Sequence, residues 1–305
     1  MLWAPRDERA ELERLVGEQV VRVERAEWGF TNRTDVVTLT AGRRVVLQRY
    51  ASRSGAVHRL RITAALTQPM AAVGVPTPRL IRGDVDATPP YAVFEELHGV
   101  PGQVAAGPDL SAPVFDAIAS QMGTLVRRVA AVPADRLQLP RLWAEPDRLS
   151  VRATGWLAQV APLLDANEQG IVRTTISALP GLFAGRAGVL AHGDFGATNV
   201  LVADGRLTGL LDWEFARLAD PLFDIAWWAW LLRFHTPAAY ARTWPLFAAA
   251  ARVDADEVTG RRIETLQLLR VLEATVHFSD RGAETRAGWL RRLSQTLAWP
   301  RHPGG

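Results

Sequence analysis

The N-terminal third of the chain mixes short segments of alternating apolar and polar residues with two segments of helical spacing. Alternation is typical of half-buried strands, and apolar residues three or four positions apart are typical of amphipathic helices. The pattern predicts helices over 7–16 and 55–73 and strands over 19–26, 36–40, 44–50, 79–82 and 91–96. We therefore expect residues 1–97 to form a small β-rich lobe.

The pattern changes after residue 97, where long segments of helical spacing take over. The predicted helices cover 111–131, 149–165, 167–179, 224–235, 237–251, 255–274 and 283–298. Residues 188–213 form the β-rich interruption, with two strands joined by a turn at Asp204-Gly205. A β-rich lobe followed by a helical lobe over 98–305 predicts a two-lobed α+β enzyme with its site between the lobes.

Polar residues gather around the strands of this interruption. His192-Gly193-Asp194 follows one apolar segment, Asn199 comes five residues later, and Asp212-Trp213-Glu214 follows the returning strand. Asp and Asn are common turn residues, so one such pair alone would be ordinary loop chemistry. The joint pattern is far more specific, because it brings three oxygen donors to one point. Hard oxygen ligands of this kind suit Mg²⁺.

Composition excludes several other classes of function. The chain of 305 residues has no cysteine, which removes disulfides, thiolate metal sites and cysteine nucleophiles. The sequence pI of about 10.1 arises because every basic residue outside histidine is arginine, while the net charge is only +3. We therefore expect no nucleic-acid partner. The longest apolar segment, Ile225–Leu232, is too short to span a membrane, so we expect a cytoplasmic protein without a membrane partner.

Residues 189–224 resemble the aminoglycoside phosphotransferase family of small-molecule kinases, which have a protein-kinase-like fold. The shared motifs are HGD-x₄-N, the acidic pair of Asp212 and Glu214, and the tail Asp220-Pro-Leu-Phe-Asp224. The resemblance implies that Asp194 is the catalytic carboxylate, that Asn199 and Asp212 bind Mg²⁺, and that Glu214 reaches a second metal or its water shell. It also implies ATP or GTP as phosphoryl donor and a small hydroxylated acceptor.

Three further roles are weighed against ordinary structural ones. The segment 91–99 resembles the hinge that holds adenine, with Phe94 as gatekeeper and the backbone of Glu95 and Leu97 facing the base; the alternative is a plain strand end. Asn32, in a loop with one glycine, would touch a phosphate or belong to an ordinary turn. We expect His192 to brace its loop. We expect Asp220 and Asp224 to cap loops or a helix, and Trp227, Trp228 and Trp230 to be core residues.

The first lobe departs from the family at the phosphate-binding pair. Kinase-like enzymes use a strand Lys paired with a helix Glu, yet this chain has no lysine and no Glu between Glu27 and Glu95. Gln48 stands at the strand position, Arg49 should face the opposite side, and His58 and Arg59 occupy the helix region. Either another clamp replaces the pair, or the protein is a catalytically silent kinase-fold binder of a small molecule or protein.

The residues after 224 bear on the acceptor. Counted from Asp224 itself, they include eleven arginines against eight acidic residues, whereas a polycationic aminoglycoside requires carboxylates. A local acidic pocket from Asp280 and Glu284 would still suit such an acceptor. A neutral or weakly charged antibiotic or metabolite is at least as compatible. The sequence therefore predicts a Mg²⁺-dependent O-phosphotransferase that acts on a hydroxyl of a small molecule.

Overall fold

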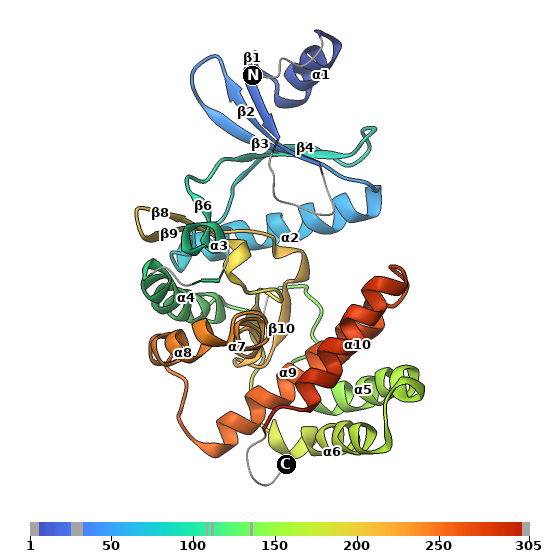
Figure 1. Ribbon diagram of the computed structural model, residues 1–305. Coiled ribbons are helices and arrows are strands. Elements are labelled where there is room, and N and C mark those ends of the chain that lie inside the picture. Colours follow the sequence, from blue (N-terminus) through green and yellow to red (C-terminus); the bar gives the residue numbers. More distant parts are fainter. Residues whose placement is uncertain (1–5, 26–32, 108, 111–112, 135–136, 301–305) are drawn as a thin grey trace.

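The chain folds into a small upper part and a larger lower part (Figure 1). This computed structural model describes residues 6–25, 33–107, 109–110, 113–134 and 137–300. The upper part contains a five-stranded antiparallel sheet, and the lower part is mainly helical. The predicted α+β architecture of two unequal lobes is therefore confirmed.

The sheet of the upper part has the strand order β1-β2-β3-β5-β4. A short helix covers one of its faces and a long helix lies beneath it, toward the lower part (Figure 1). These elements are α1 (Arg6–Val16), β1 (Val20–Arg25), β2 (Arg33–Leu39), β3 (Arg44–Arg49), α2 (Arg53–Ala72), β4 (Leu80–Asp84) and β5 (Tyr91–Glu95).

Strand β3 separates two environments by its alternation. Val45 and Leu47 are buried in the apolar cluster that includes Leu12 and Leu15 of α1. Arg49 shares their face and forms a buried ion pair with Asp35 of β2, as predicted for a side chain opposite Gln48. Gln48 therefore lies on the other face of the sheet, toward α2, which it shares with Arg44 at the start of the strand.

The lower part has one apolar core, built mostly by helices. Helix α7 is buried along almost its whole length, and Trp228 stacks on Phe247 of α8 with ring centroids 3.8 Å apart. Helices α4 and α8 approach closely at Gly123, where an added Cβ would lie 2.3 Å from the Phe247 carbonyl oxygen. The helices are α3 (Gly102–Ala106), α4 (Val114–Ala130), α5 (Pro146–Val160), α6 (Ala166–Leu182), α7 (Phe223–His235), α8 (Pro237–Ala251), α9 (Glu257–His277) and α10 (Ala283–Leu297).

Two small sheets carry the polar loops of the lower part. In one, β6 (Val100–Pro101), β8 (Val200–Ala203) and β9 (Arg206–Leu210) pair in the order β6-β8-β9. In the other, β7 (Val189–Ala191) pairs with β10 (Arg217–Ala219). The hairpin of β8 and β9 and the strand before His192 were predicted, whereas β6, β10 and α3 were not. The helix predicted over 149–165 ends earlier, at Val160, and a 3-10 turn follows it.

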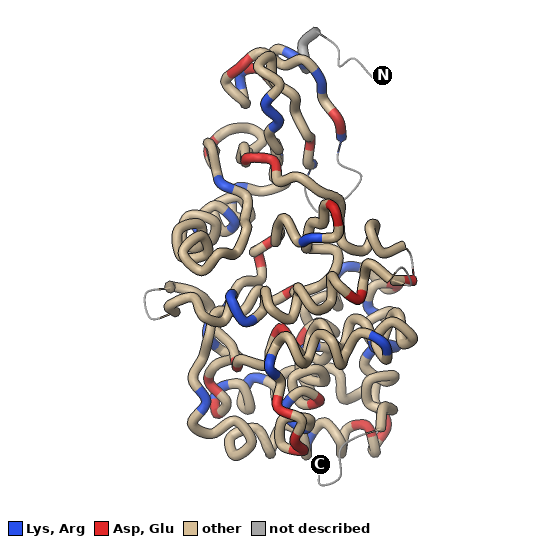
Figure 2. Tube along the Cα trace, turned by 90° about the vertical axis from the view of Figure 1, so that its left-hand side faces the viewer, with Lys and Arg blue, Asp and Glu red and all other residues tan. Residues whose placement is uncertain are grey.

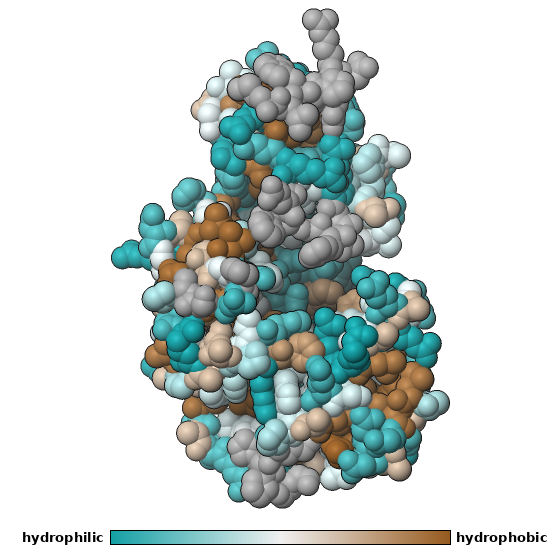
Figure 3. Space-filling view, in the orientation of Figure 1, coloured by the Kyte–Doolittle hydropathy of each residue, from teal (hydrophilic) through white to brown (hydrophobic). Residues whose placement is uncertain are grey.

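The surface shows no concentration of one charge. Basic and acidic positions are interspersed over both parts (Figure 2). On the side seen in Figure 3, hydrophilic residues cover most of the visible upper part, and separate apolar groups lie over the lower part. Within the described residues, no helix is both long and apolar enough to cross a bilayer.

Candidate active site

The loop after β7 places Asp194 at the junction of several elements. Gly193 has φ +88°, and an added Cβ would lie 2.1 Å from the Phe215 carbonyl oxygen, so only glycine fits this turn. The backbone N–H groups of His192 and Gly193 donate to the buried Asp224 carboxylate at 2.6 and 2.9 Å. Asp224 thus braces the loop from α7. This agrees with the expected loop cap, whereas the expected helix cap is wrong, since no side chain caps α7.

His192 fixes the same loop from within. Its Nε2 donates to the Leu211 carbonyl at 2.7 Å, and its Nδ1 accepts from the Asp194 backbone N–H at 3.2 Å. These partners define the tautomer with hydrogen on Nε2. The ring is fully buried. Both contacts agree with the predicted bracing role and tie the Asp194 loop to the strand end before Asp212.

Both carboxylate oxygens of Asp194 accept a hydrogen bond. Trp227 Nε1 of α7 donates to Oδ1 at 2.9 Å. Asn199 Nδ2 donates to Oδ2 at 3.1 Å and to the Asp194 backbone carbonyl at 2.8 Å. Two donors from separate elements therefore fix the carboxylate plane. Because its amide nitrogen is used toward Asp194, Asn199 keeps its amide oxygen as an acceptor for a cation.

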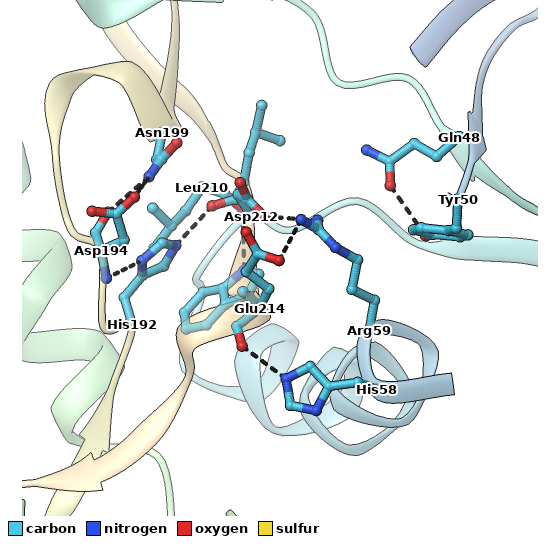
Figure 4. Close-up of polar contacts among 12 residues, drawn as sticks. Gln48, Tyr50, His58, Arg59, His192, Asp194, Asn199, Leu210, Asp212 and Glu214 are labelled. Carbon is cyan, nitrogen blue, oxygen red and sulfur yellow. Dashed lines mark hydrogen bonds and ion pairs between the residues drawn. The ribbon is translucent and has the colours of Figure 1, made fainter. Parts of the chain in front are cut away.

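The acidic pair lies beside this group (Figure 4). Asp212 adopts a left-handed conformation, φ 63° and ψ 62°, at the start of the 3-10 turn Trp213–Phe215. Its neighbour Leu211 donates a backbone hydrogen bond to the Asn199 carbonyl at 2.8 Å, so Asp212 follows directly on a strand end held against Asn199. Burial and the neighbouring Asp212 raise the pKa of Glu214, against the opposing effect of Arg59.

A cation already lies between the two acids. Arg59 of α2 donates from Nη1 to Asp212 Oδ1 at 2.8 Å and from Nη2 to Glu214 Oε2 at 2.5 Å. His58 Nε2 also donates to the Glu214 backbone carbonyl at 2.9 Å. Among the described residues, no group of three or more His, Asp or Glu side chains could hold a metal ion. A metal would therefore use two carboxylates and the Asn199 amide, and this oxygen set fits Mg²⁺.

The upper part contributes Gln48 and Tyr50 on the opposite side of Arg59 (Figure 4). Tyr50 OH donates to Gln48 Oε1 at 3.2 Å, which leaves the amide nitrogen of Gln48 as a donor. Burial raises the pKa of Tyr50 to about 12. Gln48 is therefore held by a neutral partner. Its contact with a nucleotide phosphate stays a prediction.

The hinge residues lie at and beyond the end of β5. Phe94 pairs with Val46 of β3 in the sheet register and packs against the small apolar cluster that includes Ala92 and Ala56. Glu95 forms an ion pair with Arg79. The Leu97 side chain lies over Gly209 of β9. Their contacts with a nucleotide base stay a prediction, and Asn32 lies outside the described residues.

A buried charge cluster under the Asp194 loop was not predicted. Glu273 of α9 accepts from Arg270 at 2.7 Å and from Arg217 at 3.4 Å, and Trp143 Nε1 donates to it at 3.2 Å. Arg270 lies 5.1 Å from the Trp227 ring centroid. Burial would raise the pKa of Glu273, but the two arginines outweigh it and hold that pKa below its usual value.

Comparison with known proteins identifies the family. Residues 22–252 match the model of the phosphotransferase enzyme family. The chain belongs to this family. It is 31% identical over 194 residues to viomycin phosphotransferase of Streptomyces vinaceus, across 58% of this chain and 64% of that enzyme. The match thus spans less than two thirds of the relative. The predicted resemblance to aminoglycoside phosphotransferases is confirmed.

Solved structures of phosphotransferases share the fold. The GDP complex of aminoglycoside 2'-phosphotransferase-IIIa has a TM-score of 0.75 at 17% identity and covers 95% of this chain and 98% of that one. A thermostable aminoglycoside phosphotransferase in ternary complex with ADP and hygromycin B has a TM-score of 0.69 at 18% identity, covering 97% and 99%. These likenesses establish the kinase-like fold of this family member.

Proposed function

We propose that this protein transfers the γ-phosphoryl group of a nucleoside triphosphate to a hydroxyl of a small molecule. The observation that carries the proposal is the doubly held Asp194 carboxylate beside the acidic pair. A carboxylate fixed by Trp227 and Asn199 has the chemistry to orient an acceptor hydroxyl and accept its proton. Family membership supports phosphoryl transfer as the reaction.

The reaction requires positioning and charge neutralisation more than covalent catalysis by the protein. The acceptor oxygen forms a bond to the γ-phosphorus, and the bond from that phosphorus to the bridging oxygen of the nucleoside diphosphate breaks. Asp194 accepts the acceptor's proton, so the products are a phosphate monoester and a nucleoside diphosphate. Bound Mg²⁺ would neutralise charge on the phosphates. Asn199, Asp212 and Glu214 would hold it.

The nucleotide is proposed to lie between residues 1–97 and 98–305. Phe94 and the backbone of Glu95 and Leu97 would face its base, and the free amide of Gln48 would face its phosphates. Solved relatives contain GDP or ADP, so both ATP and GTP are candidate donors. The cytoplasmic location stays a prediction.

The acceptor is proposed to be a neutral or weakly charged hydroxylated antibiotic or metabolite. The residues from 224 onward support this class, because eleven arginines outnumber eight acidic residues there, whereas a polycationic acceptor requires carboxylates. An acceptor screen should therefore test neutral hydroxylated compounds beside the basic antibiotics viomycin and hygromycin B, which the names of a relative and of a solved structure supply.

A silent kinase-fold protein is the second candidate, because the strand Lys and helix Glu are both missing. Thermal-shift titration with ATP or GTP and Mg²⁺ separates the two. A ligand that binds the folded state stabilises it by RT ln(1+[L]/Kd), so the phosphotransferase should show a rising melting temperature with nucleotide. An unchanged melting temperature at saturating concentrations of both nucleotides would support the silent protein.

A further inference from the structure

The phosphate-binding cation of kinases has no counterpart on β3. Gln48 carries no charge, and its carbonyl oxygen already accepts from Tyr50 OH at 3.2 Å. Arg49 faces the opposite side of the sheet, where it pairs with the buried Asp35. A transferred phosphoryl group nevertheless requires positive charge besides the metal. Arg44, at the start of β3 on the same face as Gln48, pairs with Glu24 at 3.4 Å and with Glu96 at 2.9 Å. The charge is therefore better supplied by another element.

Helix α2 supplies a cation at the required place. Arg59 lies between the acidic pair on one side and Gln48 of β3 with Tyr50, the residue after β3, on the other (Figure 4). Its side chain is only 15% exposed, so the guanidinium is fixed rather than free in solvent. A guanidinium also offers a planar fork of donors that matches phosphate oxygens in a bidentate manner.

The present partners of Arg59 are also the proposed metal ligands. Asp212 and Glu214 carry two negative charges against the single charge of Arg59, so the cluster retains an excess of negative charge. A divalent cation at these carboxylates would compete with the guanidinium for the same oxygens. Arg59 would then need new acceptors, and the nucleotide phosphates at that metal would lie within its reach.

We infer that Arg59 is the nucleotide-phosphate cation of this protein. Other kinases carry this positive charge on a strand Lys. In this protein the charge is on helix α2, in the region where those kinases carry the Glu partner of that Lys. Asp212 and Glu214 hold the guanidinium in the structure, and on binding of nucleotide and metal it would exchange these carboxylates for phosphate oxygens. This inference rests on the proposed function, because it assumes a nucleotide between the two parts.

The test compares Arg59→Gln and Arg59→Lys with the wild type in calorimetric titrations. The probes are the triphosphate with Mg²⁺, the corresponding nucleoside, and Mg²⁺ alone. Loss of a charge-assisted contact should weaken triphosphate binding about tenfold to a hundredfold, while nucleoside affinity is unchanged. Mg²⁺ alone should bind more tightly to Arg59→Gln, because its carboxylates are released. Arg59→Lys should restore part of the triphosphate affinity.

Arg53→Gln is the matched control. Arg53 lies on the same helix but pairs with the exposed Asp86 at 2.7 Å, so its loss should leave all three affinities unchanged. Equal or tighter triphosphate binding by Arg59→Gln would overturn the inference and make Arg59 a mere competitor of the metal. Equal weakening of triphosphate and nucleoside would show a structural role instead. A wild type that binds neither ATP nor GTP would overturn the proposed function as well.

Discussion

Trp227 is predicted to position the catalytic carboxylate. Trp227→Phe removes the indole N–H that donates to Asp194 Oδ1 at 2.9 Å, while keeping an aromatic ring against Trp230. A hydrogen bond to a charged group contributes about 1.5–3 kcal/mol. At about 1.4 kcal/mol for each factor of ten, its loss should lower kcat about tenfold to a hundredfold. The KM for nucleotide should change little, because Trp227 does not contact the proposed nucleotide residues.

The matched control is Trp230→Phe, which removes the same atoms one turn away. Trp230 Nε1 donates to Thr296 Oγ1 at 2.9 Å within the core. Both variants should lower the free energy of unfolding by about 1–3 kcal/mol in urea titrations. Steady-state release of nucleoside diphosphate then separates them, since the loss of kcat should be confined to Trp227→Phe. An unchanged kcat in that variant, or an equal loss in Trp230→Phe, would refute the positioning role.

Two further substitutions test the buried cluster and the neutral strand residue. Glu273→Gln should lower the free energy of unfolding by about 3 kcal/mol near neutral pH, because Arg270 and Arg217 lose their buried counter-charge. The folded-state pKa of Glu273 lies below the usual 4.5. Its contribution to stability is therefore present above pH 4.5 and is lost as the pH falls through the lowered value. Urea titrations across pH should show the difference in unfolding free energy between the wild type and Glu273→Gln shrinking in acid, and a difference that grows in acid would contradict the assignment. Gln48→Ala should weaken triphosphate binding by about 1 kcal/mol, the worth of a neutral hydrogen bond, which calorimetry measures; a loss above a hundredfold would give Gln48 a role beyond one amide contact.

Much of the fold was predictable because its elements are long and periodic. The helices over 237–251 and 283–298 follow from apolar spacing, and α8 and α10 occupy almost the same residues. The strands β6 and β10 have only two and three residues, too few for alternation to appear. The helix predicted to end at residue 179 continues through Pro180 to Leu182, since tertiary packing outweighs the missing hydrogen bond of one proline.

The candidate site was predictable only where its residues are close in sequence. Asp194 and Asn199 share one loop, and the hairpin returns the chain to Asp212. Arg59 reaches Asp212 across 153 positions, and no local pattern encodes that distance. The sequence did mark the helix position as unusual through its missing Glu. Trp227 was predicted to be a core residue because most of its helix is apolar. Its indole N–H, which donates to Asp194, could not be placed from the sequence.

Transfer of a labelled γ-phosphoryl group tests the central claim most directly. The wild type and Asp194→Asn, a variant of equal size, are incubated with ATP or GTP, Mg²⁺ and a panel of hydroxylated antibiotics and metabolites. Asp194→Asn removes the proton acceptor but leaves the proposed nucleotide residues in place, so it should still be stabilised by nucleotide. We predict a labelled phosphate monoester with the wild type and essentially none with the variant. Equal labelling by the two proteins would contradict the catalytic role of Asp194, and no labelling of any acceptor by the wild type would contradict the proposed phosphotransferase activity.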